Sequence, residues 1–323
     1  MLDVVFFEVF AEEEKALKKY LPATLKAEFT PHTIQEAKSK NLPAPLISVR
    51  TQSVIPTAWS KRLKGVLTRS SGYEHLLDFR RENKSDAACG YLADYCSRAV
   101  AEQAVLMAAA LLRKLKLQTK QFDRFNRDNL TGFEIQGRKC LVVGVGYIGR
   151  QVVDIAKGLK MYVKGVDLKH AQKDLKYVGL LEGIRWADVV ICALPLTKET
   201  RGMLNYDVLK QIPRGSILVN VSRGEITPLA DMERLLEEKI LGGLGLDVYE
   251  NEGRLAVALR ANKKVASPQA QSLVRLSKKE QVLFTPHNAF NTYESVERKA
   301  QESAESIMAF IKTGKFLNPV PQE

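Results

Sequence analysis

The sequence predicts an α/β protein built from two parallel-sheet domains. Over residues 1–100, short apolar strands alternate with short helical segments, and the same alternation returns over residues 138–290. Alternation at this spacing is typical of a parallel sheet covered by helices. The length of 323 residues suits one large domain or two ordinary ones, and a hydrophobic content of 45% is enough to bury a core in each.

The N-terminal block is expected to begin the first sheet. Its predicted strands are short and apolar: Leu2–Phe7, Leu25–Phe29, Leu46–Val49 and Gly65–Leu67. A highly charged helix is expected over Glu12–Tyr20, and a short helix capped by Thr33 over Thr33–Ser39. The turn-rich stretch from Arg69 to Tyr73 follows a strand. It should therefore lie at the carboxyl edge of the sheet, where α/β proteins bind ligands.

A long helix, Ser97–Leu117, is predicted next, with Ser97 as its N-cap. Its alanine-rich body suits close packing where the chain crosses from the first domain to the second. From Thr292 to Phe310 the pattern is again helical and amphipathic, which suits a return to the first domain. The second block contains predicted strands at Lys139–Val143, Met161–Asp167, Ala187–Leu194, Ser216–Val221, Leu244–Val248 and Gln281–Thr285.

Composition argues against several classes of protein. The longest uncharged run in the apolar middle, Gln103–Leu112, is too short for a membrane span, and the N-terminal MLDVVFFEVF lacks the basic start of a signal peptide. The cysteines, Cys89, Cys96, Cys140 and Cys192, show no metal-binding spacing. Cys140 and Cys192 lie in apolar runs and are predicted to be core residues. We therefore expect a cytoplasmic protein without a metal site.

The net charge of +12, from 49 basic and 37 acidic residues, suits either an anionic partner or a lysine-rich surface. The basic residues are scattered and often stand beside acidic ones, as in RLSKKEQ, and no basic block is interleaved with aromatic residues. This pattern disfavours nucleic acid as a partner. A positive field around a cleft for small carboxylates is at least as reasonable.

A glycine-rich turn, GVGYIG at residues 144–149, joins an apolar strand to an amphipathic helix, and Asp167 ends the next strand. The glycines permit a tight turn, a close approach of the backbone to a pyrophosphate, and close packing of the helix on the strand. The helix N-terminus suits phosphate, and Asp167 suits the ribose hydroxyls of adenosine. Because a 2′-phosphate would be repelled by Asp167, NAD is predicted rather than NADP. The expected contacts are Gly144, Gly146, Tyr147, Ile148, Gly149 and Asp167.

Three later strands are each followed by a polar residue that suits hydride chemistry on a 2-oxo acid: Arg223, Glu250 or Glu252, and His287. The carboxyl ends of parallel strands share one edge, so these side chains should converge near the cofactor. Arginine can hold a carboxylate and polarise a carbonyl, and histidine can donate the proton as hydride arrives. A carboxylate would orient the imidazole and favour its charged form. Taken singly, each could instead be an ordinary surface or loop residue, but the glycine turn favours the functional interpretation.

Five segments, GVGYIG, ICALPLTKETRGMLN, SILVNVSRGEI, GLDVYENE and LFTPHNAFNT, in this order and spacing resemble the D-isomer-specific 2-hydroxyacid dehydrogenases. The resemblance is strongest from Tyr91 to Glu297. It implies a flavodoxin-like substrate domain, residues 1–100 and 292–323, into which a Rossmann NAD-binding domain, residues 101–291, is inserted. It also implies a homodimer made through the cofactor domains.

The resemblance assigns the catalytic roles residue by residue. Arg223 corresponds to the substrate-binding arginine and His287 to the acid/base histidine. The family's acid lies five residues after the aspartate of the GLDV segment, Asp247, which selects Glu252 rather than Glu250. Asp247 itself corresponds to the residue that contacts the nicotinamide amide.

The same resemblance implies the substrate contacts. Ser71 and Gly72 correspond to a loop whose backbone amides bind the substrate carboxylate. Tyr95 corresponds to a pocket tyrosine of the D-lactate-dehydrogenase-like branch. Further cofactor contacts are expected at Pro195, Thr200 and Val221. Candidates for the wall of the substrate pocket, which could equally be core residues, are Val49, Tyr73, Tyr95 and Phe290.

Two features depart from the family's usual pattern. Between Glu252 and His287 the family commonly has a shorter loop, whereas residues 253–281 are expected here to form a long basic loop. This loop could cap the site or contact a partner, but exposed surface is the favoured role. Ser97 stands where the family usually has a proline, which concerns local loop geometry rather than chemistry.

The sequence therefore predicts an NAD-dependent D-2-hydroxyacid dehydrogenase, with pyruvate and D-lactate as the expected substrate pair. Glu252 argues against the formate-oxidising branch, which carries an amide at that position. Two alternatives stay open: a non-enzymatic regulator that senses NAD on the same scaffold, and a family member that acts on glyoxylate or phosphite.

Overall fold

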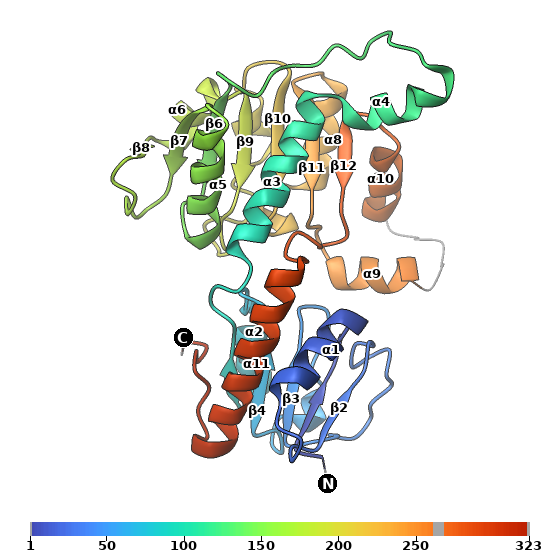
Figure 1. Ribbon diagram of the computed structural model, residues 1–323, viewed down its shortest axis with the longest axis vertical. Coiled ribbons are helices and arrows are strands. Elements are labelled where there is room, and N and C mark those ends of the chain that lie inside the picture. The colour runs from blue at the N-terminus through green and yellow to red at the C-terminus, as the bar shows by residue number, and fades with distance from the viewer. Residues whose placement is uncertain (1, 261–267, 322–323) are drawn as a thin grey trace. The chain divides into compact units, whose positions relative to one another are not determined.

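The computed structural model describes residues 2–260 and 268–321 (Figure 1). The chain divides into two compact units: unit 1 comprises Met1–Cys96 and Asn291–Glu323, and unit 2 comprises Ser97–Phe290. The boundaries expected from the sequence, after residue 100 and before residue 292, differ from these by four residues and one residue. In the described part of the chain, no helix combines the length and the apolar character that a membrane crossing requires.

Unit 1 contains a five-stranded parallel sheet with the strand order β2-β1-β3-β4-β5. This is the order of flavodoxin-like sheets, as predicted. The strands are β1 (Val4–Phe6), β2 (Ala27–Phe29), β3 (Leu46–Val49), β4 (Gly65–Thr68) and β5 (Ala88–Gly90). The helices are α1 (Ala11–Tyr20), α2 (Glu74–Asn83) and α11 (Tyr293–Thr313), with the 3-10 helix η1 (Thr57–Trp59).

The core of unit 1 forms because its central strands are apolar on both faces. Every residue of β1, β3 and β4 is buried, as expected for strands covered by helices on two sides. The C-terminal helix α11 begins at Thr292, whose hydroxyl caps it by accepting a hydrogen bond from the Ser295 amide at 3.2 Å. It packs against α1 and β4 and belongs to unit 1.

The helix predicted over Thr33–Ser39 is wrong. Thr33 and Glu36 do form the reciprocal hydrogen bonds of a helix start: the Glu36 amide donates to Thr33 Oγ1 at 3.2 Å, and the Thr33 amide donates to Glu36 Oε2 at 2.9 Å. However, Lys38 enters the left-handed region with φ of 51°, which ends the segment after a single turn. The capping hydrogen bonds therefore start a single turn, but the segment does not continue as a helix.

Unit 2 contains a seven-stranded parallel sheet with the order β12-β11-β10-β9-β6-β7-β8. Counted from β6, this is the Rossmann order with a seventh strand at one edge, as predicted. The strands are β6 (Lys139–Val143), β7 (Tyr162–Val166), β8 (Lys176–Tyr177), β9 (Val189–Cys192), β10 (Ser216–Asn220), β11 (Leu241–Leu246) and β12 (Val282–Phe284). The helices are α3 (Ser97–Leu112), α4 (Leu115–Gln121), α5 (Tyr147–Gly158), α6 (Leu180–Trp186), α7 (Tyr206–Leu209), α8 (Leu229–Glu237), α9 (Glu252–Arg260) and α10 (Pro268–Ser277), with 3-10 helices η2 (Phe122–Arg124) and η3 (Gly224–Ile226).

The predicted long helix is interrupted. α3 packs against α5, β10 and β11, but it ends at Leu112. The carbonyl of Leu112 accepts a hydrogen bond from the Phe133 amide at 2.9 Å, and Lys114 adopts a φ of 51°. The chain restarts as α4 at Leu115, and none of the residues of α4 is buried.

Residues 253–281 are not a loop, which corrects the sequence prediction; residues 261–267 lie outside the described part. α9 and α10 occupy most of this stretch. α10 buries Ala270, Leu273 and Leu276, spaced three residues apart on one face, against α8 and β12. Surface was the expected role of this segment, but α10 is part of the unit 2 core.

Candidate active site

The glycine turn joins β6 to α5. Its three glycines are not all required for the same reason. At Gly144, with φ of 93°, an added Cβ would lie 2.6 Å from the Ala193 carbonyl oxygen; at Gly149 it would lie 1.9 Å from the Gly144 carbonyl oxygen. The protein's own packing therefore requires these two. At Gly146 an added Cβ would meet no protein atom within 4 Å. Packing does not explain this glycine, whereas a ligand that approaches the backbone does.

The start of α5 suits the phosphates of an adenosine diphosphate group, and the residue that follows β7 suits its ribose. Gly146 is the N-cap of α5, no side chain caps the helix, and its first turn contains no acidic residue. Its amide groups suit phosphate. Asp167 accepts hydrogen bonds from the amides of Val145 at 2.7 Å and Lys169 at 2.8 Å, which holds its carboxylate beside the turn. The residues present therefore fit NAD.

The other expected cofactor residues lie on the loops after β9 and β10. Thr200 is buried; its hydroxyl donates to the Pro195 carbonyl at 2.7 Å and accepts from the Thr197 amide at 2.8 Å, so it shapes this loop. Val221 follows β10 directly and is buried. Its amide donates to the Cys192 carbonyl at 3.3 Å, which joins the two loops.

Arg223 stands on the loop after β10, and this loop packs against the one after β11. The side-chain amide of Asn220 donates to the Arg223 carbonyl at 2.9 Å and fixes the turn. At Gly224 an added Cβ would lie 2.1 Å from the carbonyl carbon of Tyr249, so only glycine allows the two backbones to meet. The loops of Arg223 and of the two glutamates are thereby brought side by side.

His287 and Glu252 contact each other directly. Nδ1 of His287 lies 2.7 Å from Oε1 and 2.8 Å from Oε2 of Glu252, with both side chains partly exposed, at 25% and 18%. Glu250 lies elsewhere: burial raises the pKa of its carboxyl, which interacts with the backbone of Leu229. Because Glu252 holds Nδ1, Nε2 is the nitrogen of His287 presented to a ligand.

Asp247 holds the loop that carries His287. Its carboxylate, with no exposed surface, accepts hydrogen bonds from the Thr285 hydroxyl at 2.5 Å, the Asn288 amide at 2.8 Å and the Ala289 amide at 3.0 Å. Burial raises the pKa of Asp247, although these bonds oppose the shift. The sequence predicts a nicotinamide contact at Asp247, but it gives no signal for Thr285 other than its place two residues before the histidine.

The predicted substrate loop lies in unit 1, after β4. The Ser70 hydroxyl donates to the Gly72 carbonyl at 2.7 Å and closes the loop. Within the described residues, the amides of Ser71 and Gly72 donate to no protein acceptor, which suits an anion. Tyr95 is buried, and burial raises the pKa of its hydroxyl well above the usual value.

The four candidates for the substrate-pocket wall differ in their surroundings. Val49 is fully buried in the hydrophobic core of unit 1, and Phe290 is buried in unit 2. The ring of Tyr73 packs on that of Tyr91, with centroids 4.7 Å apart.

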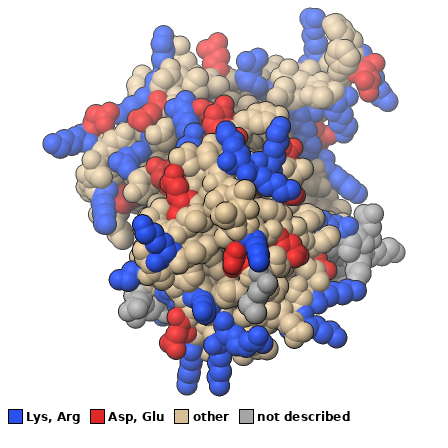
Figure 2. All heavy atoms as spheres, turned by 60° about the horizontal axis from the view of Figure 1, so that its bottom comes forward, with Lys and Arg blue, Asp and Glu red and all other residues tan. Residues whose placement is uncertain are grey.

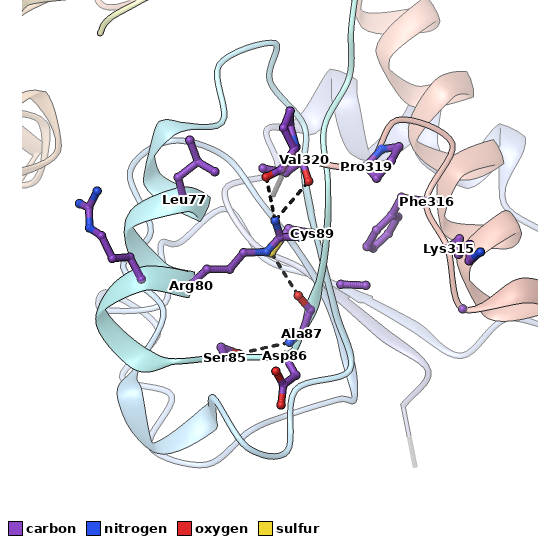
Figure 3. Close-up of a pocket in the computed structure, with 14 residues that line it drawn as sticks. Leu77, Arg80, Ser85, Asp86, Ala87, Cys89, Lys315, Phe316, Pro319 and Val320 are labelled. Atoms are coloured by element: carbon purple, nitrogen blue, oxygen red, sulfur yellow. Dashed lines mark hydrogen bonds between the residues drawn. The ribbon is translucent and has the colours of Figure 1, made fainter. Parts of the chain in front are cut away.

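A separate cavity of about 830 Å³ lies in unit 1, beside β5 (Figure 3). The end of α2 and the C-terminal segment line it, and it contains none of the predicted site residues. Arg80 donates to the carbonyls of Val320 at 3.1 Å and Pro321 at 3.2 Å, which fastens the C-terminal segment to α2. The buried thiol of Cys89 lies beside it. All four cysteines are free and buried, and the prediction of Cys140 and Cys192 as core residues is confirmed.

Known proteins resemble this chain in sequence and in fold. A sequence profile described as "D-isomer specific 2-hydroxyacid dehydrogenase, NAD binding domain" matches residues 104–289. A D-lactate dehydrogenase of Escherichia coli is 34% identical over 66% of each chain, and one of Streptococcus agalactiae is 27% identical over 83% of this chain and 82% of its own. The crystal structure of the Aquifex aeolicus D-lactate dehydrogenase with NAD and lactic acid superposes with a TM-score of 0.85 at 27% identity, covering 99% of this chain and 100% of that one.

The profile covers more than half of the chain and coincides with unit 2, which contains the glycine turn, Asp167 and the His287–Glu252 pair. NAD is the cofactor, and the protein is an oxidoreductase that acts on CH–OH groups. The chain belongs to the D-isomer specific 2-hydroxyacid dehydrogenase family.

Proposed function

We propose that the protein reduces pyruvate, or a closely related 2-oxo acid, to the D-2-hydroxy acid with NADH, and catalyses the reverse reaction. Unit 1 is then the substrate domain and unit 2 the cofactor domain. The observation that carries the proposal is the His287–Glu252 contact at 2.7 Å, which lies at the carboxyl ends of the strands of a dinucleotide-binding sheet. A histidine held by a carboxylate at this edge is suited to proton exchange with a substrate oxygen.

Each residue has a separate role in the reaction. Arg223 binds the substrate carboxylate and polarises the carbonyl, while the amides of Ser71 and Gly72 and the ring of Tyr95 position the acid from unit 1. When bound, NADH supplies the hydride that adds to the carbonyl carbon. His287 delivers a proton from Nε2 to the carbonyl oxygen, and Glu252 stabilises the imidazolium before that transfer. In the oxidation direction His287 takes the proton back.

Lactate is favoured as the product by the relatives. Those from Escherichia coli and Streptococcus agalactiae are D-lactate dehydrogenases, and the Aquifex aeolicus structure contains NAD and lactic acid. Because these relatives are enzymes, they support a dehydrogenase rather than the alternative of a non-enzymatic regulator. Basic side chains are interspersed with acidic ones on the face in Figure 2, which gives nucleic acid no further support.

The test is a substrate panel. The purified protein is mixed with NADH and, in turn, pyruvate, longer 2-oxo acids and glyoxylate, and NADH absorbance is followed; phosphite is tested with NAD. Turnover should be fastest with pyruvate or a near homologue and much slower with NADPH, because Asp167 repels a 2′-phosphate. NADH binding without turnover on any acid would refute the proposal.

We further propose a homodimer made through unit 2. The segment from Leu115 to Phe133 exposes three phenylalanines, Phe122 at 72%, Phe125 at 74% and Phe133 at 52%, and α4 buries none of its residues. Several exposed aromatic residues in one short segment favour a protein partner. Light scattering should give twice the chain mass of 36.2 kDa, and replacing Phe122 and Phe125 by serine should give the monomer.

The four free, buried thiols are compatible with a reducing compartment, and we propose the cytoplasm. Fractionation of cells that express the protein at its native level would test this, since most of the dehydrogenase activity should then appear in the cytosolic fraction.

A further inference from the structure

A buried cluster of charges, Glu13, Arg69 and Lys299, lies in unit 1 and is not explained by the proposed catalytic roles. Glu13 comes from α1, Arg69 directly follows β4, and Lys299 lies on α11. Oε1 of Glu13 is 2.8 Å from Arg69 Nε and 2.7 Å from Lys299 Nζ, and none of the three side chains has exposed surface. Burying three charges is costly, so a cluster of this kind often serves function as well as stability.

The cluster carries excess positive charge. Burial by itself would raise the pKa of Glu13, but Arg69, Lys299 and Arg50 outweigh burial and lower it to about 2. One carboxylate is therefore shared by two buried cations, with Arg50 as a third positive group acting on it. These groups follow or cover the carboxyl ends of β3 and β4, the sheet edge at which α/β proteins bind ligands.

The arginine of the cluster anchors the substrate loop. Arg69 is the residue directly before Ser70, and its guanidinium donates to Ser48 Oγ at 3.0 Å and to the Phe7 carbonyl at 2.6 Å. With the bond to Glu13, all three guanidinium nitrogens are engaged. The backbone at the start of the loop that carries Ser71 is therefore fixed to β1 and β3.

The lysine of the cluster supports Tyr95. Nζ of Lys299 lies 6.0 Å from the centroid of the Tyr95 ring, and the neighbouring Arg298 donates to the Tyr95 carbonyl at 2.8 Å. Cys96 completes the link: burial raises the pKa of its thiol to about 11, while hydrogen bonds to Tyr95 and Ser71 and the charge of Lys299 oppose the shift. The cluster, the loop and the tyrosine thus form one connected structure.

We propose that Glu13, Arg69 and Lys299 are positioning residues that hold the Ser71–Gly72 loop and Tyr95 in place, and that the excess positive charge of the cluster strengthens binding of the substrate carboxylate. This inference rests on the proposed function, in which that loop binds the carboxylate. A field from buried charge is screened less by solvent and salt than a field from surface lysines.

The proposal predicts a pH dependence of substrate affinity. Burial lowers the pKa of Lys299 to about 7; Glu13 opposes this, and Arg50 and Arg69 add to it. As pH rises through neutrality Lys299 loses its proton, the cluster loses one positive charge, and the KM for pyruvate should rise. Tyr95 and Cys96 also lie beside Lys299, and their raised pKa values keep them neutral in this range.

The first experiment compares Lys299→Met and Glu13→Gln with a matched control in the intact protein. The same helices, α1 and α11, carry a second lysine–glutamate pair, Lys19–Glu297 at 2.8 Å, whose side chains are 61% and 45% exposed. Lys299→Met should raise the pyruvate KM about ten-fold with a smaller effect on kcat. Glu13→Gln adds one net positive charge but removes the loop's charged anchor, so its pyruvate KM should rise less than that of Lys299→Met. The NADH KM should stay unchanged in both, and Lys19→Met should change neither KM.

The second experiment isolates the charge of Lys299. In Lys299→Arg the charge persists, so the rise in pyruvate KM between pH 6 and 8 should be smaller than in the natural protein. Folding of each variant is checked by circular dichroism, and if Lys299→Met does not fold, Glu13→Gln and the Lys299→Arg profile decide.

The proposal is overturned if folded variants keep the natural pyruvate KM, if the pyruvate and NADH KM values rise together, or if Lys299→Arg has the natural pH profile. A natural protein without turnover on any 2-oxo acid would instead overturn the proposed function.

Discussion

His287 adopts a φ of 50°, and Asn251, directly before Glu252, a φ of 54°. The left-handed region costs an L-residue about 1–2 kcal/mol. His287 is thus held in place by strained backbone, which the surroundings must stabilise, whereas asparagine at position 251 adopts this region more readily. At His287 this stabilisation comes from Asp247, which binds the residues on both sides of the histidine.

Replacing His287 by alanine should abolish reduction of pyruvate while leaving NADH binding near normal, because the histidine lies outside the glycine turn and supplies only the proton. Steady-state turnover and fluorescence titration with NADH measure the two effects. Glu252→Gln is the companion variant: it keeps the size of the side chain and should lower kcat about 100-fold, since the imidazolium loses its counter-charge. Substantial turnover in His287→Ala would contradict the acid/base role.

Replacing Asp247 by alanine should lower the free energy of unfolding by about 3 kcal/mol, because two backbone amides and a hydroxyl lose a charged acceptor in a buried place. Urea denaturation measures this loss. Activity should fall as well, since the His287 loop is released from β11. Thr285→Val removes only one of the three bonds and should cost about 1 kcal/mol, so equal losses in the two variants would speak against the network.

The predicted site residues and the buried cluster differ in how visible they were in the sequence. Arg223, His287 and either Glu250 or Glu252 each follow an apolar strand, so topology predicts that these residues converge, and the family resemblance selects Glu252. Nothing comparable marked Glu13, which stands in a run of three glutamates of which only it is buried. Its burial depends on the angle at which α1 meets α11, which is a tertiary property without a local pattern.

Among the elements, long apolar strands were predicted well and marginal segments poorly. β6, β9 and β10 are buried throughout or nearly so, and their apolar runs are unambiguous. β8 contains two residues and depends on pairing with β7, so its own sequence hardly indicates it. The sequence predicts a loop at α10 because the three buried residues of this helix are spread among polar ones in a basic stretch.

The turn between β6 and α5 allows a paired prediction that separates packing from binding. Gly149→Ala should lower the melting temperature strongly, because its methyl group would lie 1.9 Å from a backbone oxygen. Gly146→Ala should leave the melting temperature nearly unchanged, yet weaken NADH binding at least about ten-fold, because its methyl group would occupy the space of the pyrophosphate. Thermal unfolding and NADH titration of both variants supply the comparison. If Gly146→Ala bound NADH normally, the turn would not contact the cofactor as proposed.

For the whole molecule, the net charge of +12 should act on the approach of anionic substrates. Basic and acidic side chains are mixed on the face shown in Figure 2, so the expected effect is a weak long-range attraction rather than a strong local one. Salt screens such attraction: the Debye length falls from about 10 Å at 0.1 M to about 3 Å at 1 M. Raising sodium chloride over this range should therefore lower kcat/KM for pyruvate several-fold.

The same titration distinguishes this surface effect from the buried cluster. Because Lys299 and Arg69 have no exposed surface, salt screens their field only weakly, and the ratio of pyruvate KM between Lys299→Met and the natural protein should persist at 1 M sodium chloride. Measurements of kcat and KM at each salt concentration for the natural protein, Lys299→Met and Lys19→Met give both the salt dependence of kcat/KM and the ratio of the KM values. A ratio that falls to one at high salt would mean that Lys299 acts through solvent, as a surface charge does, and not from within the fold.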